Sequence, residues 1–170
     1  MLETPEELAR LQQLLDDSAA HGGPHLRSIL TAQRRLTAVQ LCARLQGMCL
    51  LVLATVTADG RPLVGPVDGY LLHGQFYFST GRASVRARHI AARPAVSATH
   101  MPSEELAVTV HGRAELFALL GPEHPELRHA MLDWYLPKQG IAFEEWLKRE
   151  APVAARIEAD KMFTFSMSSG

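Results

Sequence analysis

Three arginines surround the expected start of a short helix in the stretch FSTGRASVRARHI, residues 78–90. A helix N-terminus carries partial positive charge, so basic side chains are unfavourable there unless an anion is also present. Arg82, Arg86 and Arg88 nevertheless lie at this point, and residues 69–103 contain no aspartate or glutamate. The chain has no acidic residue nearby in sequence to balance this charge. The pattern therefore predicts that an anion from outside the chain binds at this turn.

The other residues of the turn indicate that the anion is a phosphate. Proteins bind phosphate with free backbone N–H groups at a helix start, with hydroxyl groups and with arginine. Ser79 and Thr80 end an expected strand, and Ser84 is the expected N-cap of the helix. Arg82 precedes the helix and Arg86 lies in its first turn, so both can reach an anion held there. A solvated basic turn is the alternative interpretation.

Motifs of other activities are missing from the sequence. It contains no GxGxxG, GxxxxGK[ST] or GxSxG segment, so dinucleotide, nucleotide-phosphate and serine-hydrolase sites are not supported. The eight histidines form neither an HExxH motif nor a cluster with cysteine, and no metal site is expected. Trp134, Tyr135 and Trp146 are interpreted as core or interface aromatics, with a cofactor contact as the less favoured alternative. No catalytic residue can be assigned.

Composition and charge restrict the class of protein further. The chain has 170 residues, 47% of them hydrophobic and 21% charged, which is typical of one globular domain spanning residues 1–170. A net charge of −1 argues against nucleic acid as a partner. The longest apolar run, residues 48–56, is too short to span a membrane. Cys42 and Cys49 are expected to be buried, reduced thiols, and the chain is expected to be cytoplasmic.

Helices are expected at both ends of the chain and strands in the middle. The capping boxes T-P-E-E and T-A-V-Q predict helices over residues 5–20 and 38–46, and a third helix is expected over residues 84–92. A helical tract is expected to begin at Gly121-Pro122 and to continue over residues 143–148. Strands are predicted at residues 48–57, 62–72, 75–79, 95–100, 105–117, 154–158 and 162–166.

Short turns between most of these strands favour a mainly β (α+β) fold, an antiparallel barrel with flanking N-terminal and C-terminal helices. Within it we expect a helical N-terminal extension over residues 1–47 and a barrel core over about 48–117. A helical segment and closing strands would occupy residues 118–170.

Three segments, taken in order, carry a resemblance to a known family. They are LATVTADGRPLVGPVDGY, then GQFYFSTGRASVRARHIAARPAVSAT, and finally LAVTVHGRAEL. Their order and spacing resemble the pyridoxamine 5′-phosphate oxidase-like split-barrel flavoproteins. The resemblance implies an antiparallel split barrel in which the second segment supplies a phosphate-binding turn.

Carried over position by position, the resemblance implies a site for FMN. Ser79 and Thr80 would bind the flavin phosphate or its ribityl chain. Residues 84–86 would complete the phosphate shell, with the backbone N–H of Val85 as one donor. The strand segment 66–68 would line the isoalloxazine ring. The cofactor-binding residues expected in this way are Pro66, Val67, Asp68, Ser79, Thr80, Arg82, Ser84, Val85 and Arg86.

The sequence also departs from the family. It lacks the R-x-V-L-L-K stretch and the R-L-x-P signature of the true oxidases. The true oxidases also carry a glutamine on a later strand, and in this chain another residue replaces it near Ala107. Oxidation of pyridoxamine phosphate itself is therefore not expected. The hypothesis is an FMN-dependent oxidoreductase acting on another small molecule. The alternatives are a deazaflavin-dependent reductase, which Arg82, Arg88 and Arg93 leave open, and a non-catalytic flavin or haem carrier or sensor.

The resemblance further implies a homodimer whose cofactor site lies at the interface. The strand at residues 75–78, Gln-Phe-Tyr-Phe, supports this hypothesis, because it alternates too poorly for a strand with one exposed face. The alternative is a monomer in which the two N-terminal helices cover the same surface.

Overall fold

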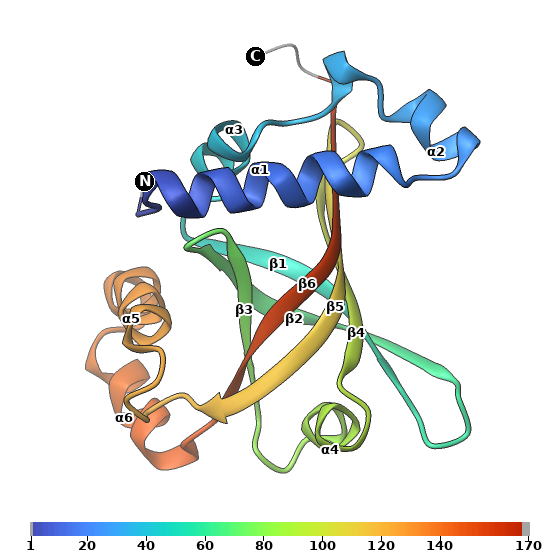
Figure 1. Cartoon of the computed structure of the whole chain (residues 1–170). Coiled ribbons are helices and arrows are strands. Elements are labelled where there is room, and N and C mark those ends of the chain that lie inside the picture. The colour runs from blue at the N-terminus through green and yellow to red at the C-terminus, as the bar shows by residue number, and fades with distance from the viewer. Residues whose placement is uncertain (1, 168–170) are drawn as a thin grey trace.

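The computed structural model describes residues 2–167 and contains a six-stranded antiparallel barrel (Figure 1). The strands follow the order β1-β2-β3-β6-β5-β4, and β4 pairs with β1 to close the barrel. Their bounds are β1 Met48–Val56, β2 Pro62–Leu72, β3 Gln75–Thr80, β4 Ala95–Ser103, β5 Leu106–Ala118 and β6 Val153–Ser166. With its flanking helices, this architecture confirms the predicted split barrel.

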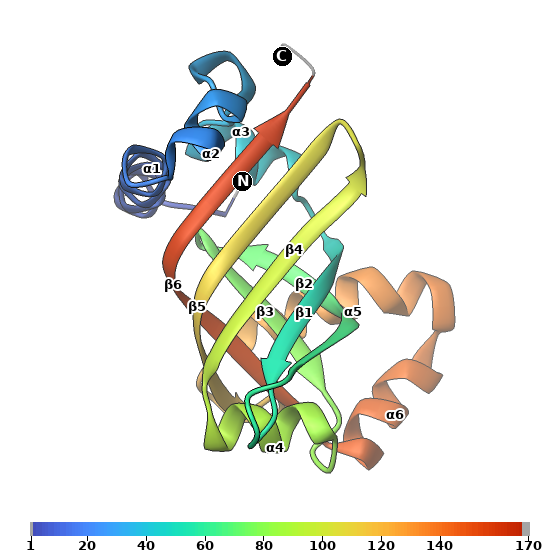
Figure 2. The same ribbon diagram turned by 90° about the vertical axis from the view of Figure 1, so that its right-hand side faces the viewer.

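Helices lie at both ends of the barrel and on one side of it. Figures 1 and 2 show α1 crossing one end, α4 at the opposite end, and α5 with α6 beside the barrel. The helices are α1 Pro5–Ala20, α2 Pro24–Ile29, η1 Ala32–Arg34, α3 Ala38–Arg44, α4 Val85–Ala92, α5 Pro125–Gln139 and α6 Ile141–Glu150. Within residues 2–167, no helix is both long enough and apolar enough to span a bilayer.

Local sequence signals account for the starts of these helices and for the tight turns. Both predicted capping boxes form, with Thr4 and Thr37 accepting hydrogen bonds from backbone N–H groups three residues on. The turn between β2 and β3 consists of His73 and Gly74, whose φ values are +53° and +73°. Positive φ at both central residues matches the right-handed twist of a two-residue hairpin, which fixes the pairing of these strands.

The C-terminal strand differs from the prediction. Two separate closing strands were expected, but β6 is continuous and pairs with β5 along its whole length. The polar residues that suggested an interruption form a bulge, because His111 pairs with Lys161 and Gly112 with Ala159, which leaves Asp160 as the extra residue. Smaller differences are the unpredicted α2, the end of α3 at Arg44 and the start of α5 at Pro125.

The strand β3 is buried on both faces within a single chain. Phe76 and Phe78 are fully buried in the barrel interior, and Tyr77 packs on the outside in the cluster formed with α5 and α6. The strand therefore gives the homodimer hypothesis no support, because the two C-terminal helices cover its outer face. Trp134 also packs against this outer cluster.

The two cysteines match the prediction of buried thiols. Cys42 and Cys49 are free and buried, and burial raises the pKa of each thiol to about 12. The prediction of one domain over residues 1–170 remains a prediction, and its outermost positions, residue 1 and residues 168–170, lie outside the described residues.

Candidate cofactor site

The site is built around the turn that joins β3 to α4. Ser84 is the N-cap of α4, as predicted, and its hydroxyl accepts a hydrogen bond of 3.0 Å from the N–H of Ala87. The hydroxyls of Thr80 and Ser84 lie 3.1 Å apart and form a second hydrogen bond. The strand end and the helix start are therefore held together through hydroxyl side chains, a type of group that can bind phosphate.

A cavity of about 720 Å³ opens at this turn, and we call it the cofactor cavity. Its size is within the usual range for small-molecule sites, about 300–1,000 Å³. Its lining residues are Pro66, Val67, Asp68, Ser79, Thr80, Gly81, Arg82, Ala83, Ser84, Arg86, Trp146, Glu150 and Pro152. All residues predicted for the cofactor site are thus brought together here except Val85. The side chain of Val85 lines a smaller neighbouring cavity of about 120 Å³.

Arg86 forms hydrogen bonds to β2 and to the end of β3, two segments that line the cofactor cavity. Its Nη1 donates to the Thr80 hydroxyl at 3.3 Å, and its Nη2 donates to the Pro66 carbonyl at 3.2 Å. Among the described residues, it forms no ion pair with a carboxylate. Burial lowers the pKa of Arg86, because desolvation disfavours its charged form. A bound anion would restore the missing counter-charge.

The four arginines of this region do not form one cluster. Arg82 lines the cofactor cavity and donates to the Ala151 carbonyl at 3.2 Å. Arg88 instead folds back on the Ala83 carbonyl at 2.8 Å, and Arg93 donates to the Val56 carbonyl at 2.9 Å. Only Arg82 and Arg86 are therefore placed to contact a ligand in the cofactor cavity.

The helix α6 and the segment after it contribute Glu150 and Pro152, which the sequence did not predict for the site, and Trp146, for which a cofactor contact was the less favoured alternative. Trp146 and Glu150 are four residues apart, which places them on one face of the helix, and both line the cofactor cavity with Pro152. The i, i+4 spacing was visible in the sequence, but nothing indicated that this face meets the basic turn. The turn contains no acid nearby in sequence, yet the fold brings Glu150 to it. The Glu150 carboxylate accepts a hydrogen bond of 2.9 Å from Arg149.

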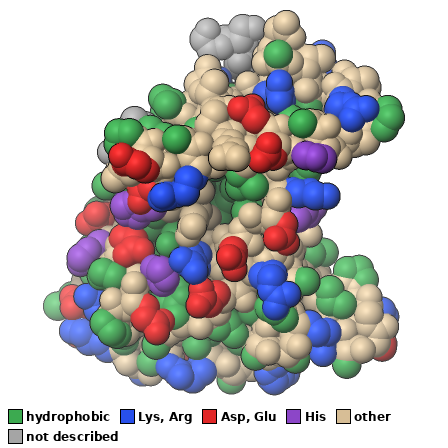
Figure 3. All heavy atoms as spheres, in the orientation of Figure 1, with side chains coloured by type: hydrophobic (Ala, Val, Ile, Leu, Met, Phe, Trp, Pro, Cys, Tyr) green, Lys and Arg blue, Asp and Glu red, His purple; other side chains and the backbone are tan. Residues whose placement is uncertain are grey.

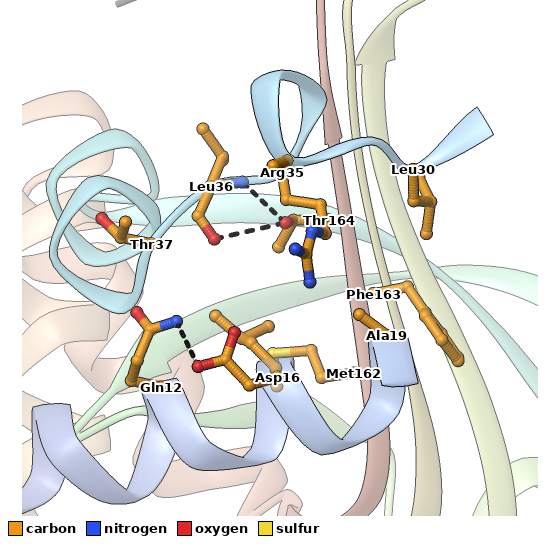
Figure 4. A pocket seen from close by; sticks show the side chains of 12 residues that line it. Gln12, Asp16, Ala19, Leu30, Arg35, Leu36, Thr37, Met162, Phe163 and Thr164 are labelled. Carbon is orange, nitrogen blue, oxygen red and sulfur yellow. Dashed lines mark hydrogen bonds between the residues drawn. The ribbon is translucent and has the colours of Figure 1, made fainter. Parts of the chain in front are cut away.

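A second cavity, of about 100 Å³, lies at the other end of the molecule between α1, the segment before α3, and β6. Figure 4 shows Arg35 and Asp16 pointing toward it from opposite sides. The Thr164 hydroxyl accepts a 2.9 Å hydrogen bond from the Leu36 N–H, which fixes the segment before α3 to β6. No residue of the predicted cofactor site lies here.

Charged side chains are mixed on the face of the molecule drawn in Figure 3, where acidic and basic groups alternate without an extended basic area. Within residues 2–167, no group of three or more His, Cys, Asp or Glu side chains has an arrangement suited to a metal ion.

Comparison with known proteins establishes the family. The family described as pyridoxamine 5′-phosphate oxidase matches residues 40–159, which include the whole barrel up to the middle of β6. The chain belongs to this family.

Solved structures with the same fold have different descriptions. One is a conserved hypothetical protein from Mycobacterium tuberculosis (TM-score 0.62, 19% identity, covering 82% of this chain and 96% of that one). Another is HutZ, described as a haem storage protein, from Vibrio cholerae (TM-score 0.62, 16% identity, covering 79% of this chain and 98% of that one). A third is an FMN-binding, pyridoxamine 5′-phosphate oxidase-related protein from Nostoc punctiforme (TM-score 0.51, 16% identity, covering 69% of this chain and 74% of that one).

At these identities the likeness extends to the fold alone. The comparison with curated proteins found no match.

Proposed function

We propose that the cofactor cavity binds FMN and that the protein is a flavin-dependent oxidoreductase acting on a small molecule other than pyridoxamine phosphate. The observation that carries the proposal is Arg86, a partly desolvated guanidinium without an acidic partner among the described residues, beside two hydroxyls and a helix start. This is the donor set that a phosphate monoester requires. The Nostoc punctiforme relative, described as FMN-binding, supports the same choice.

The residues present fit this cofactor. Arg86, Thr80 and Ser84 would hold the phosphate at the start of α4, with the backbone N–H of Val85 as a further donor, while Ser79 and Arg82 would contact the phosphate or the ribityl chain. The β2 segment 66–68 would lie along the isoalloxazine ring. FMN supplies the redox chemistry when it is bound, and the protein sets its orientation and access. The missing catalytic motif is therefore consistent with an enzyme.

We further propose that the protein is a homodimer with the cofactor cavity at the interface. Along the outward face of β2, Val64 and Pro66 are exposed, whereas Asp68 is half-buried beside the cofactor cavity and Tyr70 is buried next to α5. The cavity thus borders on an exposed apolar face. This face, which we call the β1–β2–β4 face, includes Leu50, Val52, Val64, Pro66 and Met101. A second copy of the chain seated there would cover apolar surface and the open side of the cavity.

The test begins with the purified protein. Absorbance and mass spectra of the co-purified ligand should identify FMN, and titration of ligand-free protein should give a defined affinity. Arg86→Gln should weaken FMN binding by roughly 10- to 100-fold, because hydrogen bonds to charged groups contribute about 1.5–3 kcal/mol. Arg88→Gln removes the same charge from the same helix outside the cavity and should change the affinity less than about threefold. Equal effects of the two substitutions would refute the phosphate assignment.

A haem carrier or sensor is the second candidate, because the Vibrio cholerae relative is described as a haem storage protein. A haem iron is usually held by an axial histidine, cysteine, methionine or tyrosine. None of these residue types is among the residues that line the cofactor cavity, which favours flavin. A Soret band in the co-purified ligand would support haem, and the mass of a deazaflavin would support the reductase alternative. Turnover of an electron donor separates an enzyme from a carrier.

The buried free thiols of Cys42 and Cys49 support a cytoplasmic location, since reduced cysteines are typical of a reducing compartment.

A further inference from the structure

The cavity of about 100 Å³ at the other end of the molecule takes no part in the proposed function, and we call it the N-terminal pocket. Three segments that are distant in sequence enclose it, namely α1, residues 30–37 and β6 (Figure 4). The N–H of Met162 on β6 donates a buried hydrogen bond of 2.9 Å to the Ser18 hydroxyl on α1. The N–H of Leu36 donates another, also of 2.9 Å, to the Thr164 hydroxyl. The walls of the N-terminal pocket are therefore held in place by the chain itself.

Arg35 supplies the positive charge of the N-terminal pocket. Its half-buried side chain points toward the pocket from the segment before α3 (Figure 4). Its Nε is buried without a hydrogen-bond partner, and nowhere in residues 2–167 does its guanidinium form an ion pair with a carboxylate. Buried polar groups of folded proteins are normally hydrogen-bonded. An arginine held in this way favours a carboxylate ligand, which can accept two parallel hydrogen bonds from the guanidinium.

Asp16 supplies the negative charge of the N-terminal pocket. It points toward the pocket from α1, on the side opposite Arg35 (Figure 4). Gln12 orients this carboxylate, because its Nε2 donates to Asp16 Oδ2 at 3.2 Å while its Oε1 accepts a 2.8 Å hydrogen bond from the N–H of Ala38. In the part of the chain that the structure describes, Asp16 forms no ion pair with Arg35 or with another cation. The carboxylate can therefore receive an ammonium group from a ligand.

The volume and the remaining walls of the N-terminal pocket restrict the size of the ligand. Leu15, Leu30 and Met162 line the pocket and are buried, so part of the wall is apolar. A water molecule takes up about 30 Å³ in the liquid, so the pocket has the volume of about three waters. This space suits a ligand in which two opposite charges lie close together beside a short apolar group.

We propose that the N-terminal pocket binds a small free α-amino acid with an apolar side chain, its carboxylate at Arg35 and its ammonium group at Asp16. An α-amino acid carries both charges on neighbouring atoms, so one ligand serves both residues. A simple anion or cation would pair with one of them and leave the other without a partner. The bound amino acid would bridge α1 and the segment before α3. This site is separate from the cofactor cavity and does not depend on the cofactor proposed there.

Three probes of similar size test the proposal on the wild-type protein. L-Alanine carries both charges, propionate lacks the ammonium group and ethylamine lacks the carboxylate. In an NMR titration of ¹⁵N-labelled protein, alanine should shift the amide signals of Leu36 and Met162 at the pocket wall. It should bind at least tenfold more tightly than propionate or ethylamine, because each of these loses one charge-assisted contact. Equal affinities for the three probes would overturn the proposal, and so would no binding of alanine, which would mean that the pocket holds water only.

Variants then assign each charge of the ligand to a residue. Arg35→Gln should weaken alanine binding at least tenfold without weakening ethylamine, and Asp16→Asn should weaken alanine binding without weakening propionate. The matched controls are the adjacent residues. Arg34→Gln removes a guanidinium that lies over the Phe165 ring, and Asp17→Asn removes an exposed carboxylate that does not line the pocket. Both controls should bind alanine as the wild type does. Equal losses in the controls and in the pocket variants would overturn the assignment.

Melting temperatures distinguish a bound amino acid from a direct ion pair across the pocket. Saturating alanine should raise the Tm of the wild type, since a ligand that binds only the folded state stabilises it, and should not raise the Tm of the Arg35→Gln, Asp16→Asn double variant. Without alanine, the effects of the two substitutions on Tm should be additive. Clear non-additivity in the ligand-free protein would mean that Arg35 and Asp16 bind each other in solution, which would overturn the proposal.

Discussion

Arg86 differs from the neighbouring arginines in what its guanidinium contacts. It donates to the neutral oxygens of Thr80 and Pro66 inside a cavity, whereas Arg88 reaches only the Ala83 carbonyl from an exposed position. A partly buried charge that has no carboxylate partner is unfavourable in the free protein. A phosphate would turn this unfavourable burial into a favourable interaction, so the position of Arg86 is better explained by binding than by stability.

Gly65 gives Arg86 the space it needs. A Cβ added at residue 65 would lie 2.9 Å from Arg86 Nη2, the end of a flexible side chain. Gly65→Ala should therefore displace the guanidinium and weaken FMN binding by roughly 10-fold, the effect of losing one charge-assisted hydrogen bond. The free energy of unfolding should change by less than about 1 kcal/mol. FMN titration and urea denaturation measure the two effects.

Gly69→Ala, on the same strand, is the comparison for Gly65→Ala. A Cβ there would lie 2.4 Å from the buried side chain of Leu51, so it should destabilise the fold by about 1–3 kcal/mol through overpacking. A stability loss for Gly65→Ala as large as that for Gly69→Ala would contradict the role given to Gly65.

The two thiols should be unreactive in the folded protein. Burial raises the pKa of Cys42 and Cys49 from 9.0 to about 12, so at pH 8 the reactive thiolate is roughly a thousandfold scarcer than in the unfolded chain. A colorimetric thiol reagent should report almost no reaction in native buffer and two thiols per chain in denaturant. Rapid reaction of either cysteine in the native protein would contradict this prediction.

At the scale of elements, the longest pairing of the barrel, β5 with β6, depends on a close backbone approach at its bulge. A Cβ added at Gly112 would lie 2.0 Å from the Glu158 carbonyl oxygen, and backbone atoms cannot move aside as a side-chain tip can. Gly112→Ala should therefore lower the free energy of unfolding by about 3 kcal/mol or more. Urea denaturation followed by circular dichroism measures this change.

Gly23→Ala provides the control for Gly112→Ala. No atom lies within 4 Å of the added Cβ, and the loss should be at most about 1 kcal/mol. Equal stability of Gly112→Ala and Gly23→Ala would contradict the close approach of the two strand backbones at the bulge.

At the scale of the whole molecule, the exposed β1–β2–β4 face is the feature that a single chain leaves unexplained. Val52 lies at its centre, opposite Pro66 on β2 and Thr99 on β4, and its side chain is 48% exposed. Val52→Lys should leave the fold intact, because the side chain already meets solvent, but should place a charge in the proposed interface. Sedimentation should then show a shift from twice the chain mass to 18.7 kDa, together with weaker FMN binding.

Val39→Lys is the matched control for the dimer prediction, since Val39 is 51% exposed on α3, outside the proposed interface. It should sediment as the wild type does. A wild-type protein that holds FMN as a single species of 18.7 kDa would refute a site shared between subunits.

The sequence by itself determined the features that depend on neighbouring residues. The capping boxes at Thr4 and Thr37 and the N-cap at Ser84 are satisfied within a few residues, so they form as predicted. The phosphate-type turn is also local, since residues 79–86 supply its hydroxyls, its helix start and its arginines in one stretch. The family resemblance supplied the antiparallel split barrel in which this turn lies.

Only the tertiary structure decided which distant segments meet this turn. The pattern within β3 could not reveal that α5 and α6 cover Tyr77, nor could the spacing of Trp146 and Glu150 place them in the cofactor cavity. The apparent interruption within β6 is a bulge because β5 pairs with it on both sides of Asp160. The physical reason is the same in each case: burial and pairing depend on the surface that packs against a segment, and a segment's own residues do not specify that surface.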